Sequence, residues 1–168
     1  MPEPLRKPLH PLLLDPDYWH NRVEELNLRQ RSVLTIPRPD LSSPAIDVAE
    51  IRIRTHDGIR LWGMTGRCTL GTQDLPARVR MVCHDQTLEV DREAICDGFF
   101  DIVIQEPEGR RLEDRVLDVM RACQTASDLD KVDSARITIQ MGQLGSCSSP
   151  ADELMIASQL LTRGIQLG

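Results

Sequence analysis

The sequence has few aromatic residues and no long apolar run. Phe, Trp and Tyr make up only 3% of its 168 residues, so a hydrophobic core has to consist of Leu, Ile, Val, Ala and Met. No apolar stretch approaches the roughly 20 residues of a membrane-spanning helix, which argues against insertion into a membrane. The start of the chain lacks the apolar core of a signal peptide, so a cytoplasmic location is the expectation.

Patterns typical of metal sites and disulfides are missing as well. The cysteines are odd in number and form no C-x-x-C pair, and the four histidines lack metal-ligand spacing. We therefore expect no metal and no other cofactor. In a reducing compartment the cysteines are most simply small buried apolar residues. They are Cys68, Cys83, Cys96, Cys123 and Cys147.

Basic residues are fewer than acidic residues. The 20 basic residues face 26 acidic ones, and a net charge of −6 disfavours a nucleic-acid partner. The segment from Asp85 to Gly109 is the most acidic part, with eight acidic residues and one basic residue, Arg92. A solvated face is the ordinary interpretation of such a segment, and a docking surface for a cationic partner is the alternative.

Prolines mark the first boundary along the chain. Eight of the eleven prolines fall within the first 44 residues, and proline disfavours helix at its own position and at the residue before it. Between two proline-rich stretches, residues 15–28 are predicted to form one helix, with Asp15 as N-cap and Pro16 at the first helical position. We expect a proline-rich arm with this helix over residues 1–45 and a folded domain over residues 46–168.

The rest of the chain alternates between strand and helix patterns. The first two strand patterns flank Asp57-Gly58, which is a hairpin signal, and each of the three later strand patterns is followed by a helix pattern. This alternation predicts an α/β fold, in which a mainly parallel sheet of about five strands has helices on both faces. The expected strands are 51–55, 59–64, 79–83, 102–104 and 137–141, and the expected helices are 88–96, 112–123 and 150–161.

A glycine-containing turn follows the last expected strand. Strand, turn and helix together form the frame of the G-x-S-x-G nucleophile elbow, and Met141-Gly142-Gln143-Leu144-Gly145 occupies that frame. In this register Gln143 replaces the serine. An amide can neither be deprotonated nor attack a carbonyl, so ordinary serine acyl transfer is excluded. Ser149-Pro150 also delays the start of the next helix by several residues.

Several segments, taken in order, resemble one family. They are Asp15–His20, Val48–Gly63, Leu75–His84, Phe100–Gly109 and Val132–Ile137. Together they resemble the helix before the core and the first strands of an α/β-hydrolase of the acetyl xylan esterase or cephalosporin deacetylase type, with residues 45–161 corresponding to its N-terminal half. Asp85 stands where that family has the glycine of a histidine-glycine pair, and Glu106 and Glu108 stand where it has aspartate and arginine.

The resemblance implies a particular arrangement of the sheet and the catalytic residues. It places the third and fifth strands side by side, so that His84 faces the loop Gly142–Ser149. It also places the triad acid and histidine after the nucleophile, whereas this sequence reaches Gly168 with no histidine after His84. We expect a truncated α/β-hydrolase-like domain without an intact triad.

The first functional hypothesis is a catalytically inactive hydrolase-like domain. The family's strand order makes the strand Ile137–Met141 an apolar edge, and such an edge invites pairing with another chain. Fold-back of the tail, residues 162–168, is the alternative cover. The hypothesis predicts a protein-binding or structural subunit of a homo- or hetero-oligomer, joined through this edge and the N-terminal arm. The expected interface residues are Ile137, Ile139, Met141, Tyr18 and Trp19.

Two other hypotheses give the loop after the last strand a chemical role. In the first, Cys147 or Ser146 is a relocated nucleophile of an ester or thioester hydrolase, with His84 as the base for Cys147. In the second, the loop binds a small anionic ligand or nucleotide through backbone N–H groups before the helix, although it lacks the G-K-[ST] ending of a P-loop. The expected binding residues are then Gly142, Gly145, Ser148 and Ser149.

Overall fold

The computed structural model describes residues 15–28, 33–140 and 166–167. The chain divides into two compact units, residues 1–30 and residues 31–168. In the first unit α1 spans Pro16–Leu28, and its N-cap is Asp15, whose carboxylate accepts a hydrogen bond of 2.9 Å from the amide of Asp17. Within the described ranges, no helix combines the length and the apolar character needed to cross a bilayer.

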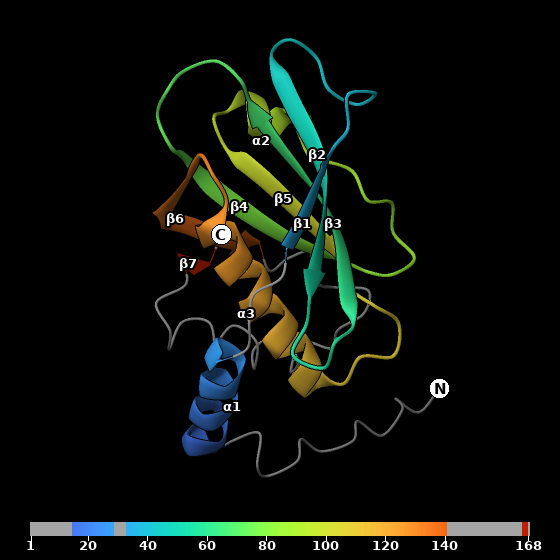
Figure 1. Ribbon diagram of the computed structural model, residues 1–168, viewed down its shortest axis with the longest axis vertical. Coiled ribbons are helices and arrows are strands. Elements are labelled where there is room, and N and C mark those ends of the chain that lie inside the picture. The colour runs from blue at the N-terminus through green and yellow to red at the C-terminus, as the bar shows by residue number, and fades with distance from the viewer. Residues whose placement is uncertain (1–14, 29–32, 141–165, 168) are drawn as a thin grey trace, which may run out of the picture. The chain divides into compact units, whose positions relative to one another are not determined.

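The second unit is built around one mixed sheet of seven strands (Figure 1). The strand order is β1-β2-β3-β5-β4-β6-β7, with antiparallel pairing from β1 to β5 and parallel pairing from β5 to β7. The strands are β1 (Val33–Pro37), β2 (Ile46–Arg54), β3 (Arg60–Cys68), β4 (Leu75–Val82), β5 (Phe100–Gln105), β6 (Val132–Gln140) and β7 (Gln166–Leu167), and the helices are α2 (Arg92–Cys96) and α3 (Leu112–Asp128).

The α/β class predicted from the sequence is confirmed, and so is the adjacency of the third and fifth expected strands, β4 and β6. The sheet has two strands more than the five expected. One is β1, in the proline-rich connector, where Pro37 is tolerated because an edge strand can leave one N–H position unpaired. The other is β7, formed by the tail. The expected helix over residues 150–161 lies outside the described residues.

One face of the sheet carries the apolar core and packs against α3. Directly paired strand residues share a face, so Ile51, Val79, Ile102 and Ile139 all point to this side, and all are buried. Helix α3 contacts β2, β4 and β6, and Figure 1 shows it lying across the sheet. The apolar positions that predict this helix, such as Val116 and Met120, are buried, and so are Asp118 and Arg121 outside that stripe.

The opposite face combines an apolar cluster with a buried ion pair. Four strand residues form the cluster, and the connection from β4 to α2 covers it; the strand residues are Val48, Met64, Val82 and Val103, and Leu88 and Val90 cover them. Beside the cluster, the Arg80 guanidinium donates to both carboxylate oxygens of Asp101, at 3.2 and 2.8 Å. The Asp91 amide donates to Asp101 at 2.8 Å, and Arg80 also donates to the Glu89 carbonyl at 3.0 Å. The pair thus ties the connection to the sheet.

We predict that Gly63→Ala destabilises the sheet. A Cβ at Gly63 would lie 2.8 Å from the Val103 carbonyl oxygen and 2.9 Å from the Ile51 side chain, so backbone has to move. Overpacking of this kind costs about 1–3 kcal/mol of the free energy of unfolding, measurable by urea denaturation. The control is Ser134→Ala, at an exposed position of β6, with an expected change within about 0.5 kcal/mol. Equal effects of the two substitutions would contradict the close contact at Gly63.

Candidate functional site

The carboxyl ends of the parallel strands form the part of this fold where a ligand crevice is expected. Strands β4 and β6 are neighbours in the sheet. From β4 the chain continues to β5, which lies on the side of β4 away from β6, whereas from β6 it continues to β7, on the side of β6 away from β4. In open α/β sheets, ligands bind where connections diverge in this way, outside the carboxyl ends of the two strands. The candidate site is therefore the edge of the sheet beyond Val82 and Gln140, where β4 and β6 end.

The turn after β4 is held by a set of hydrogen bonds. The Cys83 amide donates to the Gln86 side chain at 2.9 Å, and the Gln86 amide donates back to the Cys83 carbonyl at 3.0 Å. From β5, the Gln105 side-chain amide donates to the carbonyls of His84 and Gln86, at 3.1 and 3.0 Å. These bonds fix the backbone of the turn and leave the His84 side chain exposed.

The cysteines differ from the sequence prediction. Cys83, at the end of β4, is disulfide-bonded, whereas Cys68, Cys96 and Cys123 are free. The interpretation of the cysteines as small buried residues in a reducing compartment fits Cys123, whereas Cys83 is buried but disulfide-bonded, Cys68 is half-buried and Cys96 is exposed. Burial raises the pKa of the Cys123 thiol to about 12, because the thiolate would have no water around it, so Cys123 is chemically inert.

The loop after β5 is anchored by a buried ion pair. The Glu106 amide donates to the Val82 carbonyl at 2.8 Å, which carries the β4–β5 pairing one residue further. Both carboxylate oxygens of Glu106 accept from the Arg115 guanidinium, at 3.2 and 3.1 Å, and both side chains are buried. Glu106, which replaces the family's aspartate, therefore faces α3 and not the crevice.

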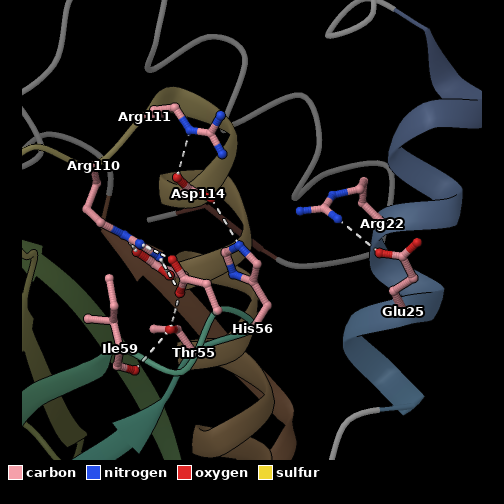
Figure 2. A network of polar contacts seen from close by, with 10 residues as sticks. Arg22, Glu25, Thr55, His56, Ile59, Arg110, Arg111 and Asp114 are labelled. Carbon is pink, nitrogen blue, oxygen red and sulfur yellow. Dashed lines mark hydrogen bonds and ion pairs between the residues drawn. The ribbon is translucent and has the colours of Figure 1, made fainter.

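A second charged cluster joins the β2–β3 turn to the first turns of α3 (Figure 2). The Arg110 guanidinium donates to both oxygens of Asp118, at 2.9 and 2.8 Å, and to both oxygens of Asp57. His56 Nε2 lies 3.0 Å from Asp114 Oδ1, and the other oxygen of Asp114 accepts from Arg111 at 3.2 Å. The cluster fastens the turn between β2 and β3 to the helix.

The two carboxylates on Arg110 have opposite pKa shifts. Burial raises the pKa of Asp118 to about 6, because the loss of hydration outweighs the hydrogen bonds from Arg110. At Asp57 burial also opposes ionisation, but hydrogen bonds from Arg110 and Thr55 outweigh it, so the pKa of Asp57 lies well below its usual value. The difference follows exposure: Asp118 is 1% exposed and Asp57 is 36% exposed.

Three side chains of this cluster are close enough together to be considered as ligands of a metal ion. The ligand atoms of His56, Asp57 and Asp114 all lie within 4.8 Å of one another. Arg110 and Arg111 already donate to the two carboxylates, so a cation would have to approach two guanidinium groups. The arrangement is that of an ion-pair cluster with a structural role.

The expected interface residues on β6 are not at an open edge. Thr138 and Ile139 pair in parallel with Gln166 and Leu167 of β7, so the expectation of an exposed edge over Ile137–Met141 is wrong along this stretch. The fold-back of the tail, which we considered as the alternative, is what covers it. Ile139 is buried and Ile137 is half-buried. Tyr18 and Trp19, on α1, form an edge-to-face ring pair with centroids 5.6 Å apart.

The other expected site residues lie outside the described residues. They are Met141, Gly142, Gln143, Gly145, Ser146, Cys147, Ser148 and Ser149. The structure does show that β6, which precedes this segment, lies beside β4, which leads into the turn with His84.

Sequence reasoning missed the buried ion pairs at this edge of the sheet. Arg110, Arg115 and Asp118 are absent from the expected site because charged residues ordinarily indicate a solvated face. The sequence signal for burial is the position of Arg115 and Asp118 next to the apolar residues Val116, Leu117 and Val119 of α3. Only the packing of the loop after β5 decides which of these charges are buried.

Comparison with known proteins defines the class of fold. No protein-family model and no curated protein sequence matches the chain. Among solved structures, the acetyl xylan esterase from Paenibacillus sp. R4 is 17% identical with a TM-score of 0.62, over 79% of this chain and 56% of that chain. Acetyl Xylan Esterase 1 from Thermoanaerobacterium sp. JW/SL YS485 is 12% identical with a TM-score of 0.61, over 80% and 55% of the two chains.

A glucuronoyl esterase from Solibacter usitatus is also similar, at 8% identity and a TM-score of 0.51, over 75% of this chain and 53% of that chain. The fold is therefore α/β-hydrolase-like. Its likeness to acetyl xylan esterase structures agrees with the family that the sequence resembles. The chain spans about half the length of these solved structures.

The opposite pKa shifts predict opposite pH effects of two matched substitutions. Asp118 keeps its proton up to about pH 6 in the folded state, whereas the unfolded chain releases it near 3.8. The stability contributed by this group is therefore present below the unfolded value and lost as pH rises through about 6. Relative to Asp118→Asn, the free energy of unfolding of the wild type should fall by on the order of 1–3 kcal/mol from about pH 4 to about pH 7.

Asp57→Asn provides the control of opposite sign. The pKa of Asp57 is lowered on folding, so its contribution is present above the unfolded value of 3.8 and lost as pH falls below it. Relative to Asp57→Asn, the wild type should therefore lose stability on acidification. Denaturant titrations across the pH range measure both differences. The assignment of the buried proton to Asp118 is wrong if the two differences change in the same direction.

Proposed function

We propose that this chain is a catalytically inactive hydrolase-like domain that acts as a protein-binding or structural subunit. The observation that carries the proposal is the sequence after β6. This strand lies parallel to β4 and its carboxyl end faces the expected crevice, which is where a hydrolase of this fold keeps its nucleophile. The residues that follow are Met141-Gly142-Gln143-Leu144-Gly145, with an amide in the place of the serine.

Two features of the described residues agree with a role that does not involve catalysis. Glu106, directly after β5, is paired with Arg115, so this carboxylate is not free to act as a general base. Among the described strands, β1 pairs only with β2, and its other side is a free sheet edge at which a partner strand can add. The proposed association therefore uses this end of the sheet and the N-terminal arm.

We predict no ester hydrolysis by the purified chain above the rate in buffer. The measurement is turnover of p-nitrophenyl acetate, acetylated xylan and cephalosporin C, with an active acetyl xylan esterase as the positive control. The reason is the loss of the nucleophilic hydroxyl at Gln143. Turnover that Cys147→Ala or Ser146→Ala abolishes would instead establish the relocated-nucleophile alternative, with Ser134→Ala as the matched control that leaves it unchanged.

The binding half of the proposal has its own measurement. Light scattering coupled to size-exclusion chromatography should give a mass above that of the monomer, alone or after mixing with a partner. A stable monomer with no partner recovered by cross-linking would contradict it. A rise in melting temperature with ATP or phosphate that Gly145→Val removes would favour the anionic-ligand alternative.

A cytoplasmic location remains a prediction, and the described residues contain one observation against it. A disulfide such as that at Cys83 is typical of oxidising compartments. Thiol labelling of the chain as isolated from its own cell, with and without reductant, distinguishes a reducing cytoplasmic location from an oxidising compartment.

A further inference from the structure

An exposed surface of unusual composition lies on β1, β2 and β3, on the side of the sheet opposite to α3. Direct pairing places Leu34 beside Arg52 and Arg52 beside Trp62, and it places Arg54 opposite Arg60. Directly paired residues share a face, so all five side chains point the same way. We call these five residues, Leu34, Arg52, Arg54, Arg60 and Trp62, the Arg–Trp surface.

Two arginines of this surface have no partner among the described residues. Arg54 and Arg60 form neither an ion pair nor a hydrogen bond there, and they are directly opposite each other on antiparallel strands. Like charges in this position destabilise a sheet. Other arginines of the same unit pair with carboxylates, among them Arg38, Arg67, Arg80, Arg110, Arg115 and Arg136. The unpaired charges are therefore available to an acidic ligand.

The same surface exposes large apolar side chains. Trp62 is 47% exposed and Leu34 is 53% exposed, in a chain with only five aromatic residues. The Arg52 guanidinium stacks over the Trp62 ring, 4.2 Å from its centroid, which holds the ring in place. A hollow of about 180 Å³ between the strands is lined by Leu34, Arg52, Arg54 and Arg60, together with Ile53. Exposed tryptophan and arginine are the residue types that carry most binding energy at protein interfaces.

Charge and geometry together define the occupant. The chain carries a net charge of −6, which repels a nucleic acid at long range, whereas a short acidic segment needs only the local charge of Arg54 and Arg60, since Arg52 is paired with Glu50 at 3.0 Å. Among the described strands β1 has no second neighbour, and this edge lies beside the surface and suits an extended peptide that pairs with backbone groups. We infer that the Arg–Trp surface binds an extended acidic segment of a protein partner, with carboxylates on Arg54 and Arg60 and an apolar side chain against Leu34 and Trp62.

This inference rests on the proposed binding function and names the chemistry of its partner. The probe is a fluorescein-labelled peptide of alternating glutamate and leucine, followed by fluorescence anisotropy, with a lysine-leucine peptide of equal length as the control probe. The wild type should bind the acidic peptide only. Arg60→Glu should weaken binding by about tenfold or more, because it places a carboxylate where the peptide's carboxylate binds.

Arg60→Glu also separates binding from folding. It places a carboxylate opposite Arg54, so that a pair of opposite charges replaces two like charges, and its melting temperature should rise while its affinity falls. The matched control is Arg136→Glu, an exposed arginine on β6, which should leave the affinity unchanged. If Arg60→Glu shows no cooperative melting, Arg60→Gln replaces it in the binding assay with the same expected direction.

Several outcomes would overturn the inference. They are equal binding of the two peptides, unchanged affinity in the Arg60 variants, or tighter binding of a single-stranded DNA than of the acidic peptide. Self-association that Arg60→Glu abolishes would identify a second copy of the chain as the occupant, and would equally contradict an acidic partner segment. Ester turnover would contradict the inactive role while leaving a positive peptide result intact, so the two failures are distinguishable.

Discussion

The buried ion pair between Arg80 and Asp101 is the interaction on which the central sheet depends. Asp101 is 0% exposed, and a carboxylate at such a position is stable only when it is paired and fully hydrogen-bonded. Two bonds from Arg80 and one from the Asp91 amide meet this requirement. The pair joins neighbouring parallel strands and holds the connection between them against the sheet, so it links strand pairing to the cover of one face.

The charged residues of α3 extend this arrangement to the carboxyl end of the sheet. Arg115 pairs with Glu106 after β5, and Asp118 pairs with Arg110, which in turn pairs with Asp57 in the β2–β3 turn. The first two pairs join α3 to the loop that precedes it, and the third joins that loop to the β2–β3 turn. These pairs hold the loops at the carboxyl end of the sheet, so Glu106 and Asp118 serve structure there, whereas His84 and Asp85 in the turn after β4 are exposed.

The two ends of the sheet differ in what they leave open. At one end, β7 pairs with β6 and removes the free edge there, over Thr138 and Ile139. At the other end, β1 has no second neighbour among the described strands, and it lies beside a half-exposed tryptophan and two arginines without a partner in the described ranges. The proposed role in contact and not in catalysis rests on this surface and on the assignment of Gln143 to the nucleophile position from the sequence. The likeness to acetyl xylan esterase structures concerns the fold, over about half of their length.

The sequence by itself determined the local elements of this protein. Apolar spacing predicts α3, Asp57-Gly58 predicts the hairpin between β2 and β3, and the alternation of strands and helices predicts the α/β class. These features depend on neighbours within a few residues, so a sequence pattern can contain them. The assignment of Gln143 to the nucleophile position stays a prediction from the sequence, because it depends on the register of one turn.

The tertiary structure alone decided which charges are buried and that β7 pairs with β6. Arg80 and Asp101 are 21 residues apart, and Arg110 and Asp57 are 53 residues apart, so no local pattern pairs them. The two-residue strand β7 is too short to have a sequence period, and β1 lies in a proline-rich stretch that favours a connector. Burial and edge pairing depend on contacts between distant segments, and these exist only once the chain is folded.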